Sequence, residues 1–127
     1  MNKADLKFTK SHEWVEPRGS KRKVGISDFA QDQMGDIVYV EFPIEGKTVH
    51  AGEEVCVIES CKATASVYAP TSGTIVRVNR ELEIAPEKIN QSPYEEGWLY
   101  EIEIDPEATE DATLMDLTTY LKTTEEH

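Results

Sequence analysis

The chain has 127 residues, enough for a single domain but not for a catalytic domain with a separate carrier domain. Hydrophobic residues make up 39% and charged residues 30% of the sequence, which is typical of a folded globular protein and not of a disordered one. With 13 basic and 25 acidic side chains, the formal net charge is −12. This charge argues against nucleic-acid binding, because phosphate neutralisation requires a basic surface.

Acidic side chains are concentrated at the C-terminal end. Residues 101–127 contain nine acidic side chains and one basic one. Such a segment is either a solvated helix or a surface for a basic partner, and we favour the solvated helix. No segment has the apolar run of a signal peptide or a membrane span, so we expect an intracellular chain with no membrane partner. A bacterial cytoplasmic location fits this pattern, although a mature mitochondrial matrix protein would look the same.

Strand patterns dominate the middle of the chain. A short helix over Asp28–Met34 interrupts them, because Ser27 is a good N-cap and Gly35 a good stop. Apolar, β-branched and aromatic runs predict strands over residues 24–26, 37–42, 55–58, 66–69, 74–78 and 98–104, with a helical turn over 87–90. Leu114, Leu117 and Leu121 form a helical stripe. This stripe predicts a C-terminal helix over approximately 107–122 that docks through these leucines.

One pattern, Gly-x-Ile-Val-x-Val, occurs twice, at residues 35–40 and 73–78. Two copies are too few for a solenoid. They indicate either two similar halves packed as a sandwich or a coincidence between two Ile- and Val-rich strands. The sequence alone leaves both alternatives open.

Two cysteines, Cys56 and Cys61, are predicted to be free thiols. If residues 55–59 form a strand, the two Cα atoms lie roughly 16 Å apart at about 3.3 Å per residue. That separation exceeds the roughly 7 Å limit for a disulfide. Two unpaired cysteines also fit a reducing compartment.

A lysine lies between two predicted strands, within Glu59-Ser60-Cys61-Lys62-Ala63-Thr64. Short connections between strands expose their tips to water, so Lys62 is expected at a hairpin tip with small neighbours. Most such lysines are merely solvated charges. An accessible amine on a rigid turn is, however, also what covalent attachment of a carrier arm requires, and such an arm can visit several active sites. We find no catalytic constellation and expect no metal site, so we do not expect this chain to be an enzyme.

The segment Glu59-Ser60-Cys61-Lys62-Ala63 resembles the lipoylation motif Glu-Ser/Thr-x-Lys-Ala, and it lacks the Met residues that usually flank a biotinyl lysine. Further blocks resemble the glycine cleavage system H protein family, in family order and spacing from about residue 8 to 104. The matching blocks are Ser11-His12-Glu13-Trp14-Val15, Val24–Gln31, Gly35–Val40, Ala69–Gly73, Val78-Asn79 and Ile89–Leu99. The combination separates this family from the lipoyl domains of 2-oxoacid dehydrogenases.

The resemblance implies a mainly β fold, a flattened β-barrel sandwich of two similar halves like lipoyl and biotinyl carriers, with short helices and a C-terminal helix. It implies covalent attachment of lipoate to Lys62, in a context that Glu59 and Ala63 provide for a lipoate ligase or an octanoyl/lipoyl transferase. Glu59 has the alternative of being a plain surface carboxylate. The implied partners are glycine decarboxylase (P-protein), aminomethyltransferase (T-protein) and dihydrolipoamide dehydrogenase (L-protein). The implied function is to carry the aminomethyl group from P-protein to T-protein and the reduced dithiol to L-protein.

The resemblance also places Ser11 and Glu13 in a cleft that shelters the loaded arm, with Ser66 at a position where many relatives have Asp. For Ser11 the alternative is a turn residue. Phe29 stands where many relatives have His, and Cys61 where Val is common. These departures suggest weaker shielding of the loaded arm, or compensation by Glu13. They keep open a second function, that of a lipoyl carrier or relay in sulfur metabolism, protein lipoylation or redox signalling. A third possible function is that of a β domain used only for binding.

Overall fold

A computed structural model describes residues 3–107 and 114–125. Its first half contains η1 (Lys3–Asp5), β1 (Lys7–Phe8), β2 (Glu13–Val15), β3 (Lys21–Ile26), α1 (Asp28–Met34), β4 (Ile37–Glu41), β5 (Thr48–Val49) and β6 (Glu54–Ser60). The second half contains β7 (Thr64–Tyr68), β8 (Gly73–Val78), η2 (Arg80–Glu83), α2 (Lys88–Gln91), β9 (Tyr100–Ile104) and α3 (Leu117–Glu125). The predicted helix over Asp28–Met34 is therefore confirmed, and each predicted strand is found within one to three residues of its expected ends.

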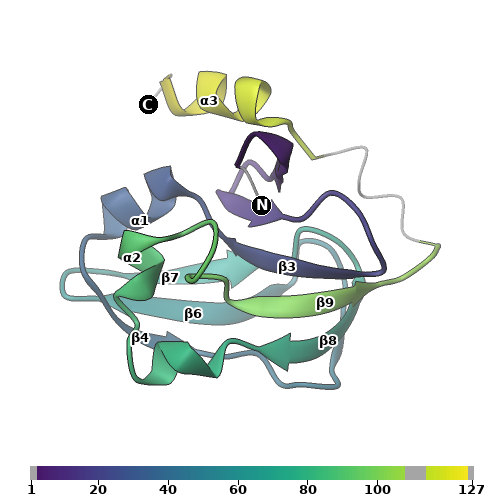
Figure 1. The fold of residues 1–127 in the computed structure, drawn as a ribbon, viewed down its shortest axis with the longest axis horizontal. Coiled ribbons are helices and arrows are strands. Elements are labelled where there is room, and N and C mark those ends of the chain that lie inside the picture. Colours follow the sequence, from purple (N-terminus) through teal and green to yellow (C-terminus); the bar gives the residue numbers. More distant parts are fainter. Residues whose placement is uncertain (1–2, 108–113, 126–127) are drawn as a thin grey trace.

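The strands form two antiparallel sheets that face each other (Figure 1). One sheet has the order β1-β2-β3-β9-β8-β5 and the other the order β4-β6-β7. The expected mainly β flattened sandwich is confirmed, but in the described residues the two sheets stay separate and do not close into one barrel. The two copies of the Gly-x-Ile-Val-x-Val pattern fall on β4 and β8, in different sheets, which agrees with a sandwich of two related halves.

The main core lies between the two sheets. It consists of buried aliphatic side chains, among them Val24, Ile58, Ile75 and Ile102, each of which is completely or almost completely shielded from solvent. A second, aromatic cluster lies on the outer side of the larger sheet and contains Leu6, Phe8, Trp14 and Tyr120. Trp14 fits there because its cross-strand partner is Gly25; a Cβ at that position would lie 2.6 Å from the indole ring. Trp14, which is 1% exposed, is thus a core residue.

The C-terminal helix differs from its prediction. The helix α3 begins at Leu117, not near residue 107, and residues 108–113 of the predicted range lie outside the described residues. Met115 is extended, because its backbone N–H and C=O both bond to Phe8 at 2.7 Å. The predicted docking through the leucine stripe holds in part: Leu117 packs on the aromatic cluster and Leu114 on the main core, whereas Leu121 is 46% exposed. The fully buried anchor of α3 is Tyr120. Figure 1 shows α3 lying beside the N-terminal segment.

Among the residues described, no helix is long and apolar enough to cross a membrane. The same residues contain no group of three or more His, Cys, Asp or Glu side chains arranged to hold a metal ion. Cys56 is buried, Cys61 is exposed, and both are free thiols, as predicted.

Candidate functional site

The hairpin between β6 and β7 presents Lys62 to solvent. Its turn is closed by the backbone N–H of Ser60, which donates to the carbonyl of Ala63 at 2.8 Å. The hydroxyl oxygen of Ser60 accepts bonds from the N–H groups of Lys62 at 3.3 Å and Ala63 at 3.0 Å. A serine that bonds the backbone two and three residues ahead fixes a tight turn. Lys62 is therefore an exposed side chain on a defined backbone.

The end of α1 supports this turn from the side. The N–H of Cys61 donates to the carbonyl of Asp36 at 3.1 Å. Gly35, which ends α1 with a φ of 79°, leaves open the space in which the stem of Lys62 lies. A Cβ at Gly35 would be 3.1 Å from Cε of Lys62. Asn90 holds Gly35 in place, because its side-chain amide donates to the Gly35 carbonyl at 2.9 Å.

A cavity of about 370 Å³ opens beside the hairpin. Its apolar walls come from β3, α1, β6 and β7: Ile26, Phe29, Ala30, Met34, Ile58, Ala65 and Val67. Its polar lining consists of Ser11, His12, Glu13, Gln33 and Ser66. Ala65 is three residues from Lys62, at most about 11 Å of chain. A long apolar chain on Lys62 could thus fold back into this cavity, which we call the arm pocket.

Glu13 gives the arm pocket a buried carboxyl group. Its side chain is 1% exposed. One oxygen accepts from the hydroxyls of Thr9 and Ser11, both at 2.6 Å, and the other accepts from the backbone N–H of Tyr68 at 3.2 Å. Burial raises the pKa of Glu13 above its usual value, and the bonds from Ser11 and Thr9 oppose that rise. The charged form of Glu13 is therefore less favourable in the folded chain than it is in water.

A three-residue network joins the arm pocket to the C-terminal helix. The hydroxyl of Tyr120 lies 2.7 Å from Nδ1 of His12 and 2.6 Å from the hydroxyl of Ser27. Ser27 caps α1, since its hydroxyl oxygen accepts from the N–H of Ala30 at 3.1 Å. The ring of His12 packs against that of Phe29 with 4.9 Å between centroids. The pocket residue His12, and through it Phe29, is thereby connected to Tyr120, which lies 108 positions after His12 in the chain.

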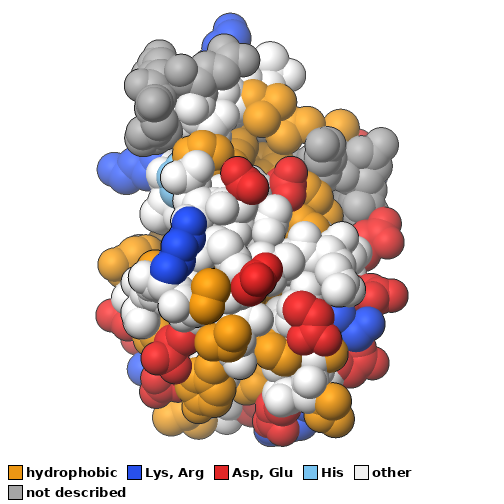
Figure 2. All heavy atoms as spheres, turned by 90° about the vertical axis from the view of Figure 1, so that its left-hand side faces the viewer, with side chains coloured by type: hydrophobic (Ala, Val, Ile, Leu, Met, Phe, Trp, Pro, Cys, Tyr) orange, Lys and Arg blue, Asp and Glu red, His pale blue; other side chains and the backbone are white. Residues whose placement is uncertain are grey.

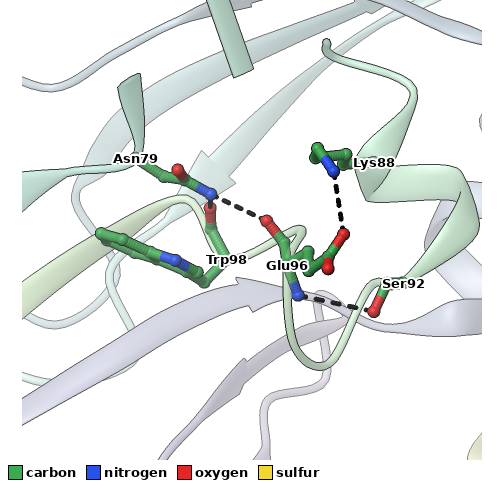
Figure 3. A network of polar contacts seen from close by, with 5 residues as sticks. All are labelled: Asn79, Lys88, Ser92, Glu96 and Trp98. Atoms are coloured by element: carbon green, nitrogen blue, oxygen red, sulfur yellow. Dashed lines mark hydrogen bonds and ion pairs between the residues drawn. The ribbon is translucent and has the colours of Figure 1, made fainter. Parts of the chain in front are cut away.

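A larger groove of about 800 Å³ lies away from the Lys62 hairpin, around Trp98. Lys23 and Arg77 lie 5.1 and 4.8 Å from the centre of its half-buried ring. Figure 3 shows how the preceding loop is fixed: the Asn79 amide donates to the carbonyls of Glu96 and Trp98, both at 2.8 Å. Lys88 adds a 2.9 Å bond to the carboxylate of Glu96. Trp98 is thus only half-buried, and these contacts are structural.

Comparison with known proteins decides the family. The model of the glycine cleavage H-protein family matches residues 6–127. The chain belongs to this family. It is 51% identical over 116 residues to a glycine cleavage system H protein of Deinococcus radiodurans, covering 91% of each chain. It is 50% identical over 123 residues to one of Anaeromyxobacter sp. (strain K), covering 96% of this chain and 94% of that one.

The fold leads to the same family. A crystal structure of a glycine cleavage system H protein from Mycobacterium marinum superposes with a TM-score of 0.84. The two chains are 32% identical, and the match covers 96% of this chain and 98% of the other. The family suggested by the lysine segment and the flanking blocks is therefore correct.

The six residues singled out from the sequence fall into two neighbouring groups. Glu59, Lys62 and Ala63 lie on the β6–β7 hairpin, and Glu59 is a half-buried residue in β6 opposite Thr64. Ser11, Glu13 and Ser66 all line the arm pocket, together with the unusual Phe29. Ser11 also does more than occupy a turn, because it donates to Glu13.

The sequence interpretation missed the network behind the pocket. The sequence gives His12 no role, and the leucine stripe of the predicted C-terminal helix does not include Tyr120. No local pattern connects these two residues or joins them to Ser27, because the contacts span 108 and 93 positions of the chain. The one signal that could have pointed to them is a Tyr beside two leucines in a predicted helix, because a buried Tyr hydroxyl usually needs a hydrogen-bond partner.

Proposed function

We propose that this chain is the lipoyl carrier of a glycine cleavage system. In this proposal Lys62 carries lipoate, and the chain brings the aminomethyl group from P-protein to T-protein and the reduced dithiol to L-protein. The observation that supports the proposal most directly is the exposed Lys62 on a fixed hairpin beside the arm pocket. The chain acts as a carrier, and its partners are the enzymes.

The residues around Lys62 fit a lipoyl group. Ala63 and Cys61 are small, so the amine is open to a lipoate ligase or an octanoyl/lipoyl transferase, which would read Glu59 and Ala63. Gly35 leaves room for the lysine stem. The apolar walls of the arm pocket match an aliphatic chain, whose transfer from water is favourable at about 25 cal/mol per Å². When attached, the group supplies a dithiolane that is reduced and reoxidised.

Within the arm pocket, residues of this chain would hold and shield the aminomethyl group on the arm. Ile26, Phe29 and Met34 exclude water from the apolar part of the arm. Glu13 stands at the polar part, where an arriving amine could pair with its carboxylate and lower the pKa that burial has raised. Ser11 and Thr9 keep that carboxylate in one orientation by bonds of 2.6 Å. Exclusion of water and pairing of the amine both slow premature loss of the cargo.

The proposal is tested by reconstitution with P-protein and measurement of glycine–bicarbonate exchange. We expect wild type and Lys21→Arg, a variant at an exposed lysine of the other sheet, to gain the mass of a lipoyl group and to support exchange. Lys62→Arg retains the charge but loses the amine and should do neither. Lipoylation of Lys62→Arg, or exchange without any lipoyl adduct, would refute the proposal.

A second candidate rests on two residues of the arm pocket. Phe29 and Ser66 both line the arm pocket. The pocket is therefore less polar than it would be with His at position 29 and Asp at position 66. A lipoyl relay in sulfur metabolism, protein lipoylation or redox signalling would need no paired amine. Under glycine cleavage, Ser66→Asp should slow the release of formaldehyde from the loaded carrier, and an unchanged rate would refute weaker shielding. A lipoylated chain that supports no exchange would favour the second candidate.

The two relatives from Deinococcus and Anaeromyxobacter support a bacterial setting. We propose that the chain works in the cytoplasm, where the three enzymes and their substrates would meet it. Its net charge of −12 suits successive electrostatically steered encounters with partners that carry basic patches. Figure 2 shows acidic side chains spread over the face toward which the β6–β7 hairpin projects.

A further inference from the structure

The hydroxyl of Tyr120 contacts two structural elements that form the arm pocket. On one side it contacts His12, in the turn before β2, and on the other it contacts Ser27, the N-cap of α1. The turn supplies Ser11, His12 and Glu13 to the pocket, and α1 supplies Phe29, Ala30, Gln33 and Met34. A backbone bond of 2.9 Å from Ser27 to the carbonyl of His12 already joins the two elements. Tyr120 adds the bonds that orient their side chains.

His12 has a backbone conformation that needs such support. Its φ of 75° makes it the one non-glycine residue with a positive φ among those described. A conformation of this kind costs free energy and persists where the surrounding contacts fix it. Here those contacts are the bond from its N–H to Thr9 at 3.1 Å, the bond from Ser27, and the bond to Tyr120. The ring of His12, held in this way, packs against the ring of Phe29 in the pocket wall.

Tyr120 is itself firmly held. It is 1% exposed, and its ring stacks on Phe8 with 4.7 Å between centroids and 9° between planes. Its hydroxyl is thus a fixed point relative to the larger sheet. We propose that Tyr120 is a positioning residue of the carrier: by fixing His12, and through it Phe29, it keeps the arm pocket closed around its cargo. This role rests on the proposed function, because it presumes that the loaded arm shelters in the pocket.

Tyr120→Phe tests the role, since it removes the hydroxyl and retains the ring that stacks on Phe8. Tyr94→Phe is the matched control. The hydroxyl of Tyr94 accepts from the backbone N–H of Asp28 at 2.8 Å, so it too bonds the start of α1. Tyr120→Phe loses the contacts with His12 and Ser27, and Tyr94→Phe loses the bond to Asp28. Both variants should therefore lose stability to urea, and Tyr120→Phe should lose about 1 kcal/mol more. We expect only Tyr120→Phe to release formaldehyde faster from the carrier loaded with glycine and P-protein, by about fivefold.

Two further measurements separate positioning from simple loss of stability. In the unmodified protein, the imidazole nitrogen chemical shifts of His12 should change in Tyr120→Phe and stay unchanged in Tyr94→Phe. His12→Asn removes the ring with a residue that tolerates a positive φ, so it should speed release as well. Adding Tyr120→Phe to His12→Asn should then have little further effect, because both act through the same ring.

Equal rates of formaldehyde release in wild type and Tyr120→Phe would overturn the role, as would an equal acceleration in Tyr94→Phe. It would also be overturned if the accelerations caused by Tyr120→Phe and His12→Asn simply multiplied in the double variant. Failure of the proposed function gives a different result. In that case P-protein would not load the lipoylated wild type at all, and an unchanged imidazole shift would still refute the bond-mediated orientation of His12.

Discussion

Glu13→Gln tests whether the buried carboxyl group of the arm pocket holds its proton. The Glu13 carboxyl group is almost fully buried and accepts bonds from Thr9, Ser11 and the backbone N–H of Tyr68. A glutamine keeps one oxygen for Tyr68 and can turn its NH₂ toward the two hydroxyls, which can accept. We therefore expect Glu13→Gln to cost about 1 kcal/mol or less at pH 5, whereas Glu13→Ala leaves donors unpaired and costs about 2–4 kcal/mol.

The sign of the pH dependence follows from the raised pKa. Burial makes the folded chain hold the Glu13 proton above the reference value of 4.5. The stabilisation from Glu13 is thus fully present below pH 4.5 and is lost as the pH rises through the folded-state pKa. Each unit by which the pKa is raised corresponds to about 1.4 kcal/mol. Glu13→Gln has no such proton to lose, so its stability should rise relative to wild type between pH 4.5 and 8.

Urea unfolding of both proteins, followed by tryptophan fluorescence across that pH range, measures the difference in the free energy of unfolding. The other carboxyl groups are common to both chains, so their titration largely cancels in this difference. We expect the free energy of unfolding of Glu13→Gln minus that of wild type to rise with pH. If this difference is constant with pH, the raised pKa of Glu13 is refuted. If it falls with pH, the bonds from Ser11 and Thr9 outweigh burial.

Three further predictions concern the surroundings of Lys62. Gly35→Ala places a Cβ 3.1 Å from Cε of Lys62 at a φ of 79°, so it should slow lipoylation as well as destabilise the fold by about 1–3 kcal/mol. Gly46→Ala shares a positive φ but has open space around it, and equal slowing there would contradict the contact argument. Asn90→Ala removes bonds to Ile37, Gln31 and Gly35 and should cost about 2–4 kcal/mol in urea unfolding; a loss below about 1 kcal/mol would contradict their importance. Iodoacetamide should modify Cys61 alone, because burial raises the pKa of Cys56 to about 12, and mass spectrometry showing both thiols modified in the folded chain would refute this.

Elements with local signals could be predicted from the sequence. The helix α1 has its cap and its stop within the element, since Ser27 bonds the N–H of Ala30 and Gly35 has the positive φ that ends it. The exposed hairpin tip at Lys62 likewise follows from two strand patterns and the small residues between them. For these features the neighbouring residues in the sequence are also the ones that make the deciding contacts.

The C-terminal helix could not be placed correctly, because distant contacts decide its start and its buried face. Met115 pairs with Phe8 and stays extended, so α3 begins only at Leu117. Tyr120 is buried in the aromatic cluster, whereas Leu121 is not part of that cluster and remains 46% exposed. The pocket illustrates the same limit: Ser11, Glu13 and Ser66 were selected by resemblance, and their convergence depends on strands β2 and β7 that meet only in the folded chain.

Under the proposed function, the geometry of the site explains how one small domain could both present an arm on Lys62 and shelter it. The root of the arm is fixed, because backbone bonds close the Lys62 turn and tie Cys61 to Asp36. The walls of the arm pocket are held by contacts of their own, because Glu13 is buried and bonded within them and Tyr120 bonds His12 from behind. Exchange between the two positions therefore requires rotation about single bonds of the lysine and its attached chain, and no rearrangement of the sandwich. Such motions are fast relative to domain movements, so a partner enzyme that binds the hairpin face competes with the pocket for the arm and needs no opening of the fold.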